Sequence, residues 1–597
     1  MRRAHTMPFG ARTADGGVEF SLWAPSVSEV TLMIDGAERA MTRDAEGWHR
    51  LHDPAARPGS LYRYRIEGGL SIPDPASRFQ PEDIEGPSQV VDPGAFAWTD
   101  DDWRGRPWEE AVLYEAHVGT ATPEGTFAAL TARLDHLRDL GITALELLPV
   151  ADFPGDRGWG YDGVLHYAPD HAYGTPEDLK RLVDEAHRRG IMVFLDVVYN
   201  HFGPSGNYLP TYAASFFTER HQTAWGAGIN FDGGAAAVVR DFFVHNALYW
   251  LEEYHFDGLR FDAVHAIADD SSRHVIGELA ERVREGLPGR EIHLVLENAA
   301  NEARWLERDE AGSPGLHSAQ WTDDTHHSWH RLLTGESDGY YADYDDAAGH
   351  LGRCLAEGFA FQGEYSAHEG ATRGEPSAHL PPSAFVNFLQ NHDQVGNRAQ
   401  GERIGALVEP AKLALARAGL LLSPQIPMLF MGEEWLASTP FQYFVDFADP
   451  ELSRAVRDGR RKEFGGFGAF AGETVPDPTD PQTFARSRLD WSEIARSPHA
   501  EVLAETKALL QLRHEQVVPL TKKRFRGATC RRPTADTLDI RWDFERGTLR
   551  FVAHFGESDA VVEGPGSSSV IWASPGIEPG TDIRLQPWTG AFLVARS

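Results

Sequence analysis

Four short apolar runs in this chain each lead into a carboxylate. The first reaches Asp196, the second Asp262, the third Glu297, and the fourth leads to Asp393. Apolar runs of this length are typical of buried strands. A carboxylate is rarely buried without a reason. A parallel barrel supplies one, because the residues that follow its strands meet at one end of the barrel and form its active site.

The segments between these runs carry helical patterns. Apolar residues within 127–140 recur at helical spacing and predict one helix, and Gly141 suits the position just past its end. A second helix is predicted to begin at Pro176, with Thr175 as its N-cap. Strands and helices that alternate over roughly 390 residues favour a parallel sheet. A single (β/α)8 barrel is the economical arrangement.

The two ends of the chain have a different period. Val30, Leu32 and Ile34 recur at a spacing of two, and two alternating runs near the C-terminus flank a turn at Arg546 and Gly547. A period of two indicates one buried and one exposed face, as in an antiparallel sandwich. We therefore predict an α/β fold in which a central (β/α)8 TIM barrel (residues 106–500) is flanked by N-terminal (1–105) and C-terminal (501–597) all-β sandwich domains.

The charge balance narrows the kind of partner. The 597 residues include 56 basic and 89 acidic ones, for a net charge of −33. This charge repels phosphate backbones and anionic lipids, so we expect no nucleic acid and no membrane as partners. Cys354 and Cys530 are the only cysteines. Two cysteines imply no disulfide framework, and with no apolar signal segment at the start we expect a cytoplasmic protein.

Arg260 and Asp262 are two residues apart on one predicted strand, so their side chains point to the same side. A guanidinium beside Asp262 favours an ionised carboxylate. Such a carboxylate can attack the anomeric carbon of a sugar. The alternative is a buried ion pair that only holds strands together.

Glu297 ends a strongly apolar strand, where burial is expected to raise its pKa and suit it to act as a general acid. Taken alone, Glu297 could be an ordinary loop residue at a strand end, and Asp393 could belong to a turn or cap a helix. Their occurrence together with Asp262 at successive strand ends favours a catalytic role for all three. A carboxylate nucleophile with a carboxylic acid is the equipment of a retaining glycosidase.

The segments around these residues resemble the four signature regions of glycoside hydrolase family 13, the α-amylase family. They are residues 196–201, 258–262, 296–298 and 391–393, in the family's order. The resemblance implies that Asp262 is the nucleophile, Glu297 the acid/base, and Asp393 a third carboxylate that distorts the sugar. It also implies that the sugar in the −1 site is held by His201, Arg260 and His392. Asp196 would support Arg260. The flanking β domains match the family's usual architecture, and the N-terminal one is carbohydrate-binding-like.

Within that family the chain is most similar to the maltooligosyltrehalose trehalohydrolases. The segments that carry this likeness are 114–119, 147–150, 158–163, 321–327, 430–435 and 441–446. The likeness implies hydrolysis of the α-1,4 bond next to the terminal trehalose of maltooligosyltrehalose, and functional pairing with a trehalose-forming synthase. Two alternatives stay open: a glycogen branching enzyme, and a non-catalytic glycan-binding barrel.

Further residues are candidates for contact with the oligosaccharide. Trp159 and Tyr161 offer flat faces to sugar rings, although a core role is the alternative. His265 is a candidate for the leaving-group side, although a packed histidine is the alternative. Glu434 and Trp435 are candidates for the trehalose end, with core packing as the alternative for Trp435. The remaining candidates follow the family stretches: Asp323, Asp324, His327, Gln394 and Asn397.

We expect no cofactor and no required metal. Asn200 resembles a calcium ligand of the calcium-dependent α-amylases. The short segment 201–240 has no clear set of Asp and Asn residues to complete such a site.

Overall fold

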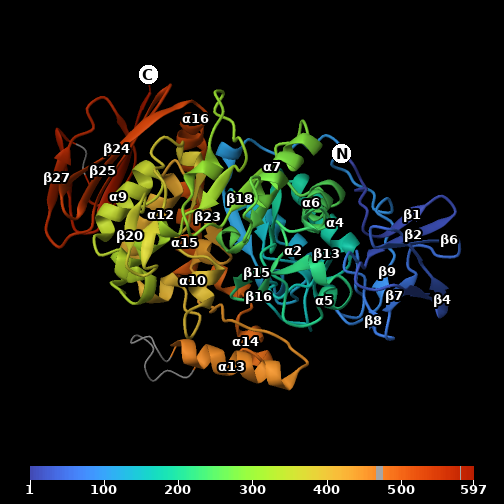
Figure 1. The fold of residues 1–597 in the computed structure, drawn as a ribbon. Helices are drawn as coiled ribbons and strands as arrows, with labels where there is room; N and C mark the ends of the chain where they lie inside the picture. The colour runs from blue at the N-terminus through green and yellow to red at the C-terminus, as the bar shows by residue number, and fades with distance from the viewer. Residues whose placement is uncertain (465–474, 578–579, 597) are drawn as a thin grey trace.

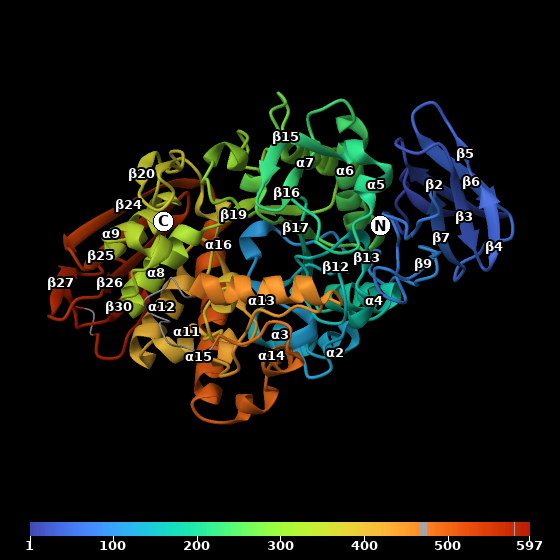
Figure 2. The same ribbon diagram turned by 60° about the horizontal axis from the view of Figure 1, so that its bottom comes forward.

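The computed structural model describes residues 1–464, 475–577 and 580–596. The molecule is elongated, and a central barrel separates the N-terminal sheets from the C-terminal sheets (Figure 1). The rotated view in Figure 2 keeps this order, with helix α13 (Pro450–Phe464) on the outside of the barrel region. Among the described helices, none combines the length and apolar composition that a membrane span requires.

Eight parallel strands close into a barrel, as predicted, and β10 pairs with β23 to complete the ring. In order around the barrel the strands are β10 (Leu113–Ala116), β11 (Ala144–Leu147), β14 (Met192–Val197), β17 (Gly258–Phe261), β18 (His293–Leu296), β19 (Ala319–Trp321), β22 (Phe385–Asn387) and β23 (Ile426–Phe430). The longer helices between and after them are α4 (Pro176–His187), α6 (Ala236–Glu253), α7 (Val275–Gly286), α8 (Asp323–Thr334), α9 (Ala347–Glu357), α12 (Pro410–Leu422) and α15 (His499–Leu512).

Helix α4 confirms the predicted N-cap. The Thr175 side chain accepts from the Asp178 backbone N–H, and the Asp178 side chain accepts from the Thr175 backbone N–H. The single helix predicted over 127–140 is instead two, α2 (Phe127–Thr131) and α3 (Leu134–Leu140). The apolar stripe continues through the break, so periodicity alone did not reveal it. Gly141 has a left-handed backbone (φ 106°) and ends α3 as expected.

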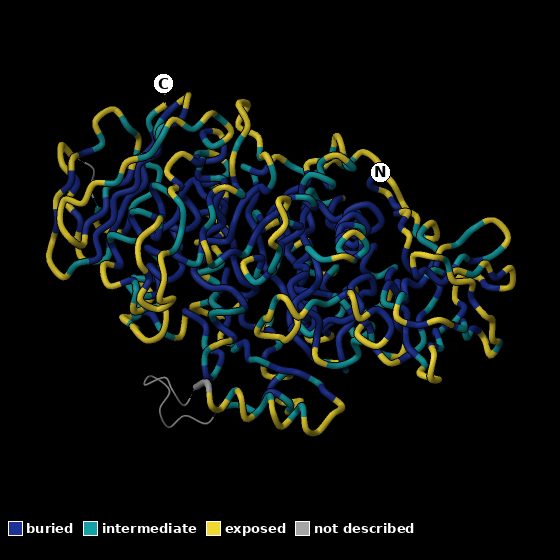
Figure 3. Tube along the Cα trace, viewed as in Figure 1, coloured by how far each residue is buried: buried dark blue, intermediate teal, exposed yellow. Residues whose placement is uncertain are grey.

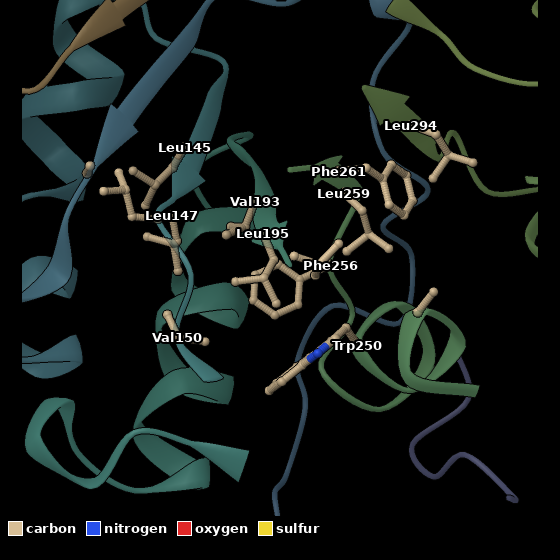
Figure 4. Packing of buried hydrophobic residues seen from close by; sticks show 14 of the residues in the cluster. Leu145, Leu147, Val150, Val193, Leu195, Trp250, Phe256, Leu259, Phe261 and Leu294 are labelled. Carbon is tan, nitrogen blue, oxygen red and sulfur yellow. The ribbon is translucent and has the colours of Figure 1, made fainter. Parts of the chain in front are cut away.

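Successive side chains along each barrel strand belong alternately to two apolar clusters. Leu259 and Phe261 pack outward with residues of neighbouring strands and helices, including Leu145 and Leu195 (Figure 4). Inward positions such as Phe194 form a separate cluster inside the barrel. Because side chains alternate along a strand, the polar residues that follow the inward set also point inward. This alternation carries Glu115, Glu146, Asp196, Arg260 and Glu297 to the inner side of the barrel.

Two sheets form the N-terminal region: β1 (Gly10–Ala14), β2 (Gly17–Trp23), β6 (Trp48–Asp53) and β5 (Thr42–Arg43) in one, and β4 (Ala37–Ala40), β3 (Val30–Ile34), β7 (Leu61–Ile66), β8 (Ser71–Ile72) and β9 (Ser88–Gln89) in the other. Val30, Leu32 and Ile34 are buried, as their spacing predicted. The burial colours in Figure 3 show exposed loops around this buried interior.

Two further sheets form the C-terminal region: β24 (Phe525–Thr534), β25 (Thr537–Phe544), β26 (Gly547–His554), β30 (Thr589–Arg596) and β28 (Ser569–Ala573) in one, and β27 (Ala560–Glu563) with β29 (Asp582–Leu585) in the other. Strands β25 and β26 are the predicted hairpin. Helix α15 contacts barrel helices α3 and α12, and the first C-terminal strand begins only at Phe525. The domain boundaries near residues 105 and 500 stay a prediction.

Candidate active site

Arg260 lies at the centre of the inward polar residues and bonds three carboxylates. Its Nη1 donates to Asp196 Oδ2 at 2.7 Å and to Asp262 Oδ1 at 2.9 Å, and its Nη2 donates to Glu297 Oε2 at 2.7 Å. The guanidinium is fully buried and lies 4.2 Å from the centroid of the Trp321 ring. The two-residue spacing of Arg260 and Asp262 therefore places them together, as expected, and the barrel adds the other two carboxylates from β14 and β18.

The pKa shifts of two of these carboxylates differ from the sequence prediction. Burial and the nearby Glu297 charge raise the pKa of Asp262 well above its usual range, against the effect of Arg260. Burial also acts to raise the pKa of Glu297, but Arg260 and the Ala263 backbone N–H hold it below the usual value. The expectation of a raised Glu297 pKa is therefore wrong, and burial and Glu297 oppose the stabilisation that Arg260 gives the Asp262 anion. The physical reason is that Arg260 bonds Glu297 as well as Asp262.

A chain of hydrogen bonds lies beside Arg260. The Tyr161 hydroxyl donates to Asp196 Oδ2 at 2.6 Å and accepts from His392 Nε2 at 2.8 Å. His392 Nδ1 lies 2.5 Å from Glu115 Oε1, and the two rings of Tyr161 and His392 stack at 5.1 Å. Burial opposes a charge on His392, but Glu115 and Asp393 raise its pKa to about 9. Near neutral pH His392 is therefore a second buried cation.

Asp393 lies in the first turn of α10 (His392–Gly396), which Asn391 caps in a capping box with Gln394. Its carboxylate is partly exposed, at 41% of the side-chain surface, and Oδ1 lies 3.6 Å from His392 Nε2. Asn397 Nδ2 donates to the same oxygen at 3.4 Å. The alternative that Asp393 is only the cap of a helix is excluded, because Asn391 fills that position.

An open pocket of about 210 Å³ joins the exposed edges of Glu297 and Asp393. Four other predicted contacts line it: Asp323, His327, Gln394 and Asn397. The sequence interpretation missed the rest of the lining: Ala299, Trp321, Tyr340, Asp343, Tyr344, Ser366, His368, Glu369, Arg373 and Asn391. Most of the missed residues come from the short helix η6 (Gly339–Asp343) and the hairpin of β20 (Glu364–Ser366) and β21 (Ala371–Arg373). The one signal available was the aromatic pair at 340 and 341.

Asp323 and His327 form one wall of this pocket. Burial and the Glu297 charge raise the pKa of Asp323 to about 7. The His327 ring stacks on Tyr340 at 4.4 Å, and its Nδ1 lies 3.1 Å from the Tyr344 hydroxyl. The wall therefore combines an aromatic face with groups that can donate or accept hydrogen bonds.

Asp324 does not contact the pocket, which corrects its assignment as a substrate contact. Its carboxylate is fully buried and accepts from Asn301 Nδ2 at 2.9 Å, the Tyr344 hydroxyl at 2.6 Å and the Ala360 backbone N–H at 2.7 Å. Arg373 Nη2 lies 3.0 Å away. Helical geometry turns this side chain away from that of Asp323, so it orients Tyr344 and Arg373 instead.

Glu434 and Trp435 also lie outside the pocket, which corrects their assignment to the trehalose end. Both residues are fully buried in η8 (Glu433–Trp435). Glu434 Oε1 accepts from the Tyr114 hydroxyl at 3.1 Å and lies 3.0 Å from His136 Nε2. The Trp435 ring packs against Trp491 at 4.9 Å. The core alternative for Trp435 is therefore the correct one, and it extends to Glu434.

The remaining aromatic and histidine candidates differ in access. Trp159 is only 6% exposed, stacks on Phe441 at 5.3 Å and has a core role. His201 Nε2 lies 3.0 Å from the Tyr161 carbonyl oxygen. Trp225, which sequence reasoning missed, covers the His201 ring at 4.3 Å and is itself 52% exposed.

His265 is exposed on the Glu297 side, and its Nδ1 accepts from the Ala299 backbone N–H at 3.3 Å. Asn200 Oδ1 lies 2.9 Å from His201 Nδ1. The prediction of no required metal at Asn200 stays a prediction.

Comparison with known proteins gives the family. Residues 90–230 match the model of the alpha amylase catalytic domain, and residues 524–592 match a domain of unknown function, DUF3459. The chain is 44% identical to an amylase-like protein from Salmonella typhimurium of known crystal structure, with a TM-score of 0.95 over 99% of this chain and all of that one. A pullulanase structure from Paenibacillus barengoltzii, 20% identical with a TM-score of 0.71 over 99% of this chain and 94% of that one, shares the fold.

Full-length relatives carry one name. Malto-oligosyltrehalose trehalohydrolase from Deinococcus radiodurans is 45% identical over 87% of this chain and 84% of its own length. The enzyme of that name from Arthrobacter ramosus is 45% identical over 89% of this chain and 92% of its own. A 1,4-alpha-glucan branching enzyme from Corynebacterium jeikeium matches only 43% of this chain, at 35% identity. The chain therefore belongs to the malto-oligosyltrehalose trehalohydrolase family within the α-amylase-type glycoside hydrolases.

Proposed function

We propose that this protein hydrolyses the α-1,4 bond next to the terminal trehalose of maltooligosyltrehalose, releasing trehalose and a maltooligosaccharide. The observation that carries the proposal is the bonding of Arg260 to Asp262 and Glu297 at the mouth of the barrel. Full-length likeness to proteins named for this activity supports it. The intact constellation argues against a non-catalytic barrel, since glycan binding alone needs no nucleophile and acid together.

The proposed reaction is a double displacement. Asp262 attacks the anomeric carbon while Glu297 gives its proton to the departing glycosidic oxygen, and trehalose leaves. The glycosyl ester on Asp262 is then hydrolysed. Glu297 takes a proton from water, the water oxygen bonds to the anomeric carbon, and Asp262 departs as a carboxylate. The α configuration is retained, and the enzyme returns to its starting protonation.

Before the first displacement the proton must be on Glu297, and Asp262 must be an anion. Asp262 has the raised pKa and Glu297 the lowered one, yet the mechanism needs the reverse. We infer that the two carboxyls enter the cycle with one proton between them, because burial and like charge disfavour two anions. An arriving glycosidic oxygen would accept a hydrogen bond only from protonated Glu297, which leaves Arg260 to pair with the Asp262 anion.

The −1 sugar is proposed to contact Asp393, His392, Arg260, His201 and Tyr161. His392 and Arg260 supply buried positive charge next to the carboxylates, and Asp393 offers an exposed acceptor. Trp225, stacked on His201, is proposed as an added face for the glucan side.

The leaving-group side is proposed to lie in the pocket beyond Glu297. Polar and aromatic residues there can pair with the hydroxyls of a 1,1-linked unit: Asp323, His327, Tyr340, Arg373, Gln394 and Asn397. A site built for such hydroxyls discriminates strongly, because a wrong ligand leaves buried groups unpaired.

The test compares maltotriosyltrehalose with maltopentaose of the same length. We expect trehalose as a product of the first and a much lower kcat/KM on the second. Formation of α-1,6 branches from amylose would establish the branching enzyme alternative. No turnover of either substrate by folded protein would establish a binding role. An inverted anomer at the new reducing end would overturn the double displacement.

The 1,1-bond of the substrate must be made by another enzyme, so we infer pairing with a trehalose-forming synthase. Its test is trehalose production from maltopentaose by the two enzymes together but by neither alone. We also infer a cytoplasmic location, since Cys354 and Cys530 are both free. Detection of the protein in a secreted fraction would contradict this.

A further inference from the structure

Asp152, Asp170 and His171 form a polar cluster at the base of a loop that reaches the active site. Asp152 ends β12 (Ala151–Asp152), and Asp170 follows β13 (Leu165–Pro169), which pairs with β12. Each residue offers one ligand atom, and the three atoms lie within 4.8 Å of one another. The loop that this hairpin encloses carries Tyr161, whose hydroxyl donates to Asp196.

Asp152 is the least satisfied member of the cluster. Its side chain is fully buried, and neither carboxylate oxygen has a hydrogen-bond partner among the described residues. Among the described residues its one ion pair is with His171, at 3.6 Å. A buried carboxylate with no direct hydrogen bond is costly, so a further counter-charge or a ligand is expected there. Arg157 of the same loop does not supply one, because it pairs with Asp446 at 2.7 Å.

His171 faces the two carboxylates at distances that suit a shared ion better than direct hydrogen bonds. Its Nδ1 lies 3.6 Å from Asp152 Oδ1 and 3.8 Å from Asp170 Oδ1. These separations exceed the range of a hydrogen bond. Ligand atoms about 2.0–2.2 Å from one ion are roughly 3.0–3.6 Å apart, so small movements would close the set around a cation.

The surroundings orient the ligands. The Asp170 carboxylate accepts from the backbone N–H groups of Ala172 at 2.8 Å and Phe153 at 3.1 Å, which fixes its direction. His171 Nε2 lies 3.5 Å from Asp156 Oδ1. Because carboxylates face both ring nitrogens, the pKa of His171 is raised to about 9, so a metal would bind Nδ1 by displacing its proton.

We propose that Asp152, Asp170 and His171 bind one divalent first-row transition-metal ion, of the Zn²⁺ or Mn²⁺ class, that fastens the base of the Tyr161 loop. Imidazole nitrogen with carboxylate oxygen suits these ions, whereas Ca²⁺ and Mg²⁺ prefer oxygen ligands alone. The ion would be structural, since the cluster is separate from the carboxylates assigned to catalysis.

The test uses untagged full-length protein freed of metal by a chelator. Calorimetric titration with ZnCl2, MnCl2, CaCl2 or MgCl2 is expected to show one site for Zn²⁺ or Mn²⁺, and the same ion should raise the Tm. Asp152→Asn and His171→Gln should each weaken metal binding at least about tenfold. Loss of a residue that only supports a metal ligand already lowers the affinity by about that factor. Glu124→Gln, at an exposed carboxyl between α1 (Val118–Ala121) and α2, is the matched control and should bind as the wild type does.

Three results would overturn the proposal. Absence of a site for either transition metal is one, and a site seen only with Ca²⁺ or Mg²⁺ is another. The third is unchanged affinity in both variants, which would move the ion elsewhere. If Asp152→Asn fails to fold, His171→Gln decides alone, because its ring is partly exposed and its loss leaves the β12–β13 pairing intact.

Discussion

Arg260 Nη2 donates to Glu297 Oε2 at 2.7 Å, so the guanidinium next to the proposed nucleophile also holds the proposed acid. Nη1 of the same residue donates to Asp262 Oδ1 at 2.9 Å. One buried cation therefore serves two carboxylates. We therefore expect catalysis to depend also on which of the two carboxyls carries the proton that they share.

Asp262→Asn should abolish turnover of maltotriosyltrehalose. The amide nearly matches the carboxylate in shape but is a far weaker nucleophile, so we expect kcat below about a hundredth of the wild-type value. Glu285→Gln, at an exposed carboxyl on α7, is the control. The measurement is trehalose release with circular dichroism of both variants. Activity above that level in the purified variant would refute the nucleophile assignment.

Glu297→Gln should fail on the natural substrate but react with maltotriosyl fluoride. Fluoride leaves without protonation, so the first displacement no longer needs an acid, whereas an acid is worth about 10²–10⁴-fold on a sugar leaving group. Without a base for the second step the ester accumulates. A burst of about one fluoride per enzyme is expected. Equal defects on both substrates would mean that Glu297 only supports Arg260.

Loss of the proton from His392 should lower the free energy of unfolding at alkaline pH. Its pKa is raised to about 9 in the folded protein from 6.5. The folded state therefore binds the proton more tightly, and the contribution is complete below about pH 6.5 and lost as pH rises through about 9. A shift of this size corresponds to stabilisation on the order of 3 kcal/mol. Urea unfolding of the wild type and His392→Gln from pH 6 to 10 measures it. The difference between the two proteins should shrink as pH rises, and a constant difference would contradict the prediction.

The barrel and its carboxylates could be predicted because the same two-residue alternation along a strand places both the apolar core residues and the polar site residues. On β17, Leu259 and Phe261 face outward, so Arg260 must face inward, and one sequence pattern determines both the core and the site. The same logic failed at Glu434, which also follows a barrel strand. Gly432 turns the backbone with φ 82°, and the Glu434 side chain bonds Tyr114 instead of reaching the barrel mouth.

The far wall of the pocket could not be predicted for a different reason. Tyr340, His368 and Arg373 come from a short helix and a hairpin that no apolar period marks. Their place depends on contacts distant in sequence, such as the 3.0 Å pair of Arg373 with Asp324. The directions of the two pKa shifts could not be predicted either. The sequence spacing revealed the bond from Arg260 to Asp262 but not the bond from Arg260 to Glu297, which joins the neighbouring strands β17 and β18.

Substitutions in the pocket can separate recognition of trehalose from support of the fold. Asp323→Asn and Tyr340→Ala change side chains that line the pocket beyond Glu297. If this pocket binds the 1,1-linked unit, each variant should lower kcat/KM on maltotriosyltrehalose about tenfold or more and leave that on maltopentaose within about twofold, since only trehalose loses partners that it had in the wild type. Glu434→Gln is the contrasting variant. Its carboxyl is fully buried against Tyr114 and His136, so it should lower the Tm and affect both substrates alike. Equal losses on both substrates for Asp323→Asn and Tyr340→Ala would place trehalose recognition elsewhere. A selective loss in Glu434→Gln would mean that η8 shapes the leaving-group side from behind.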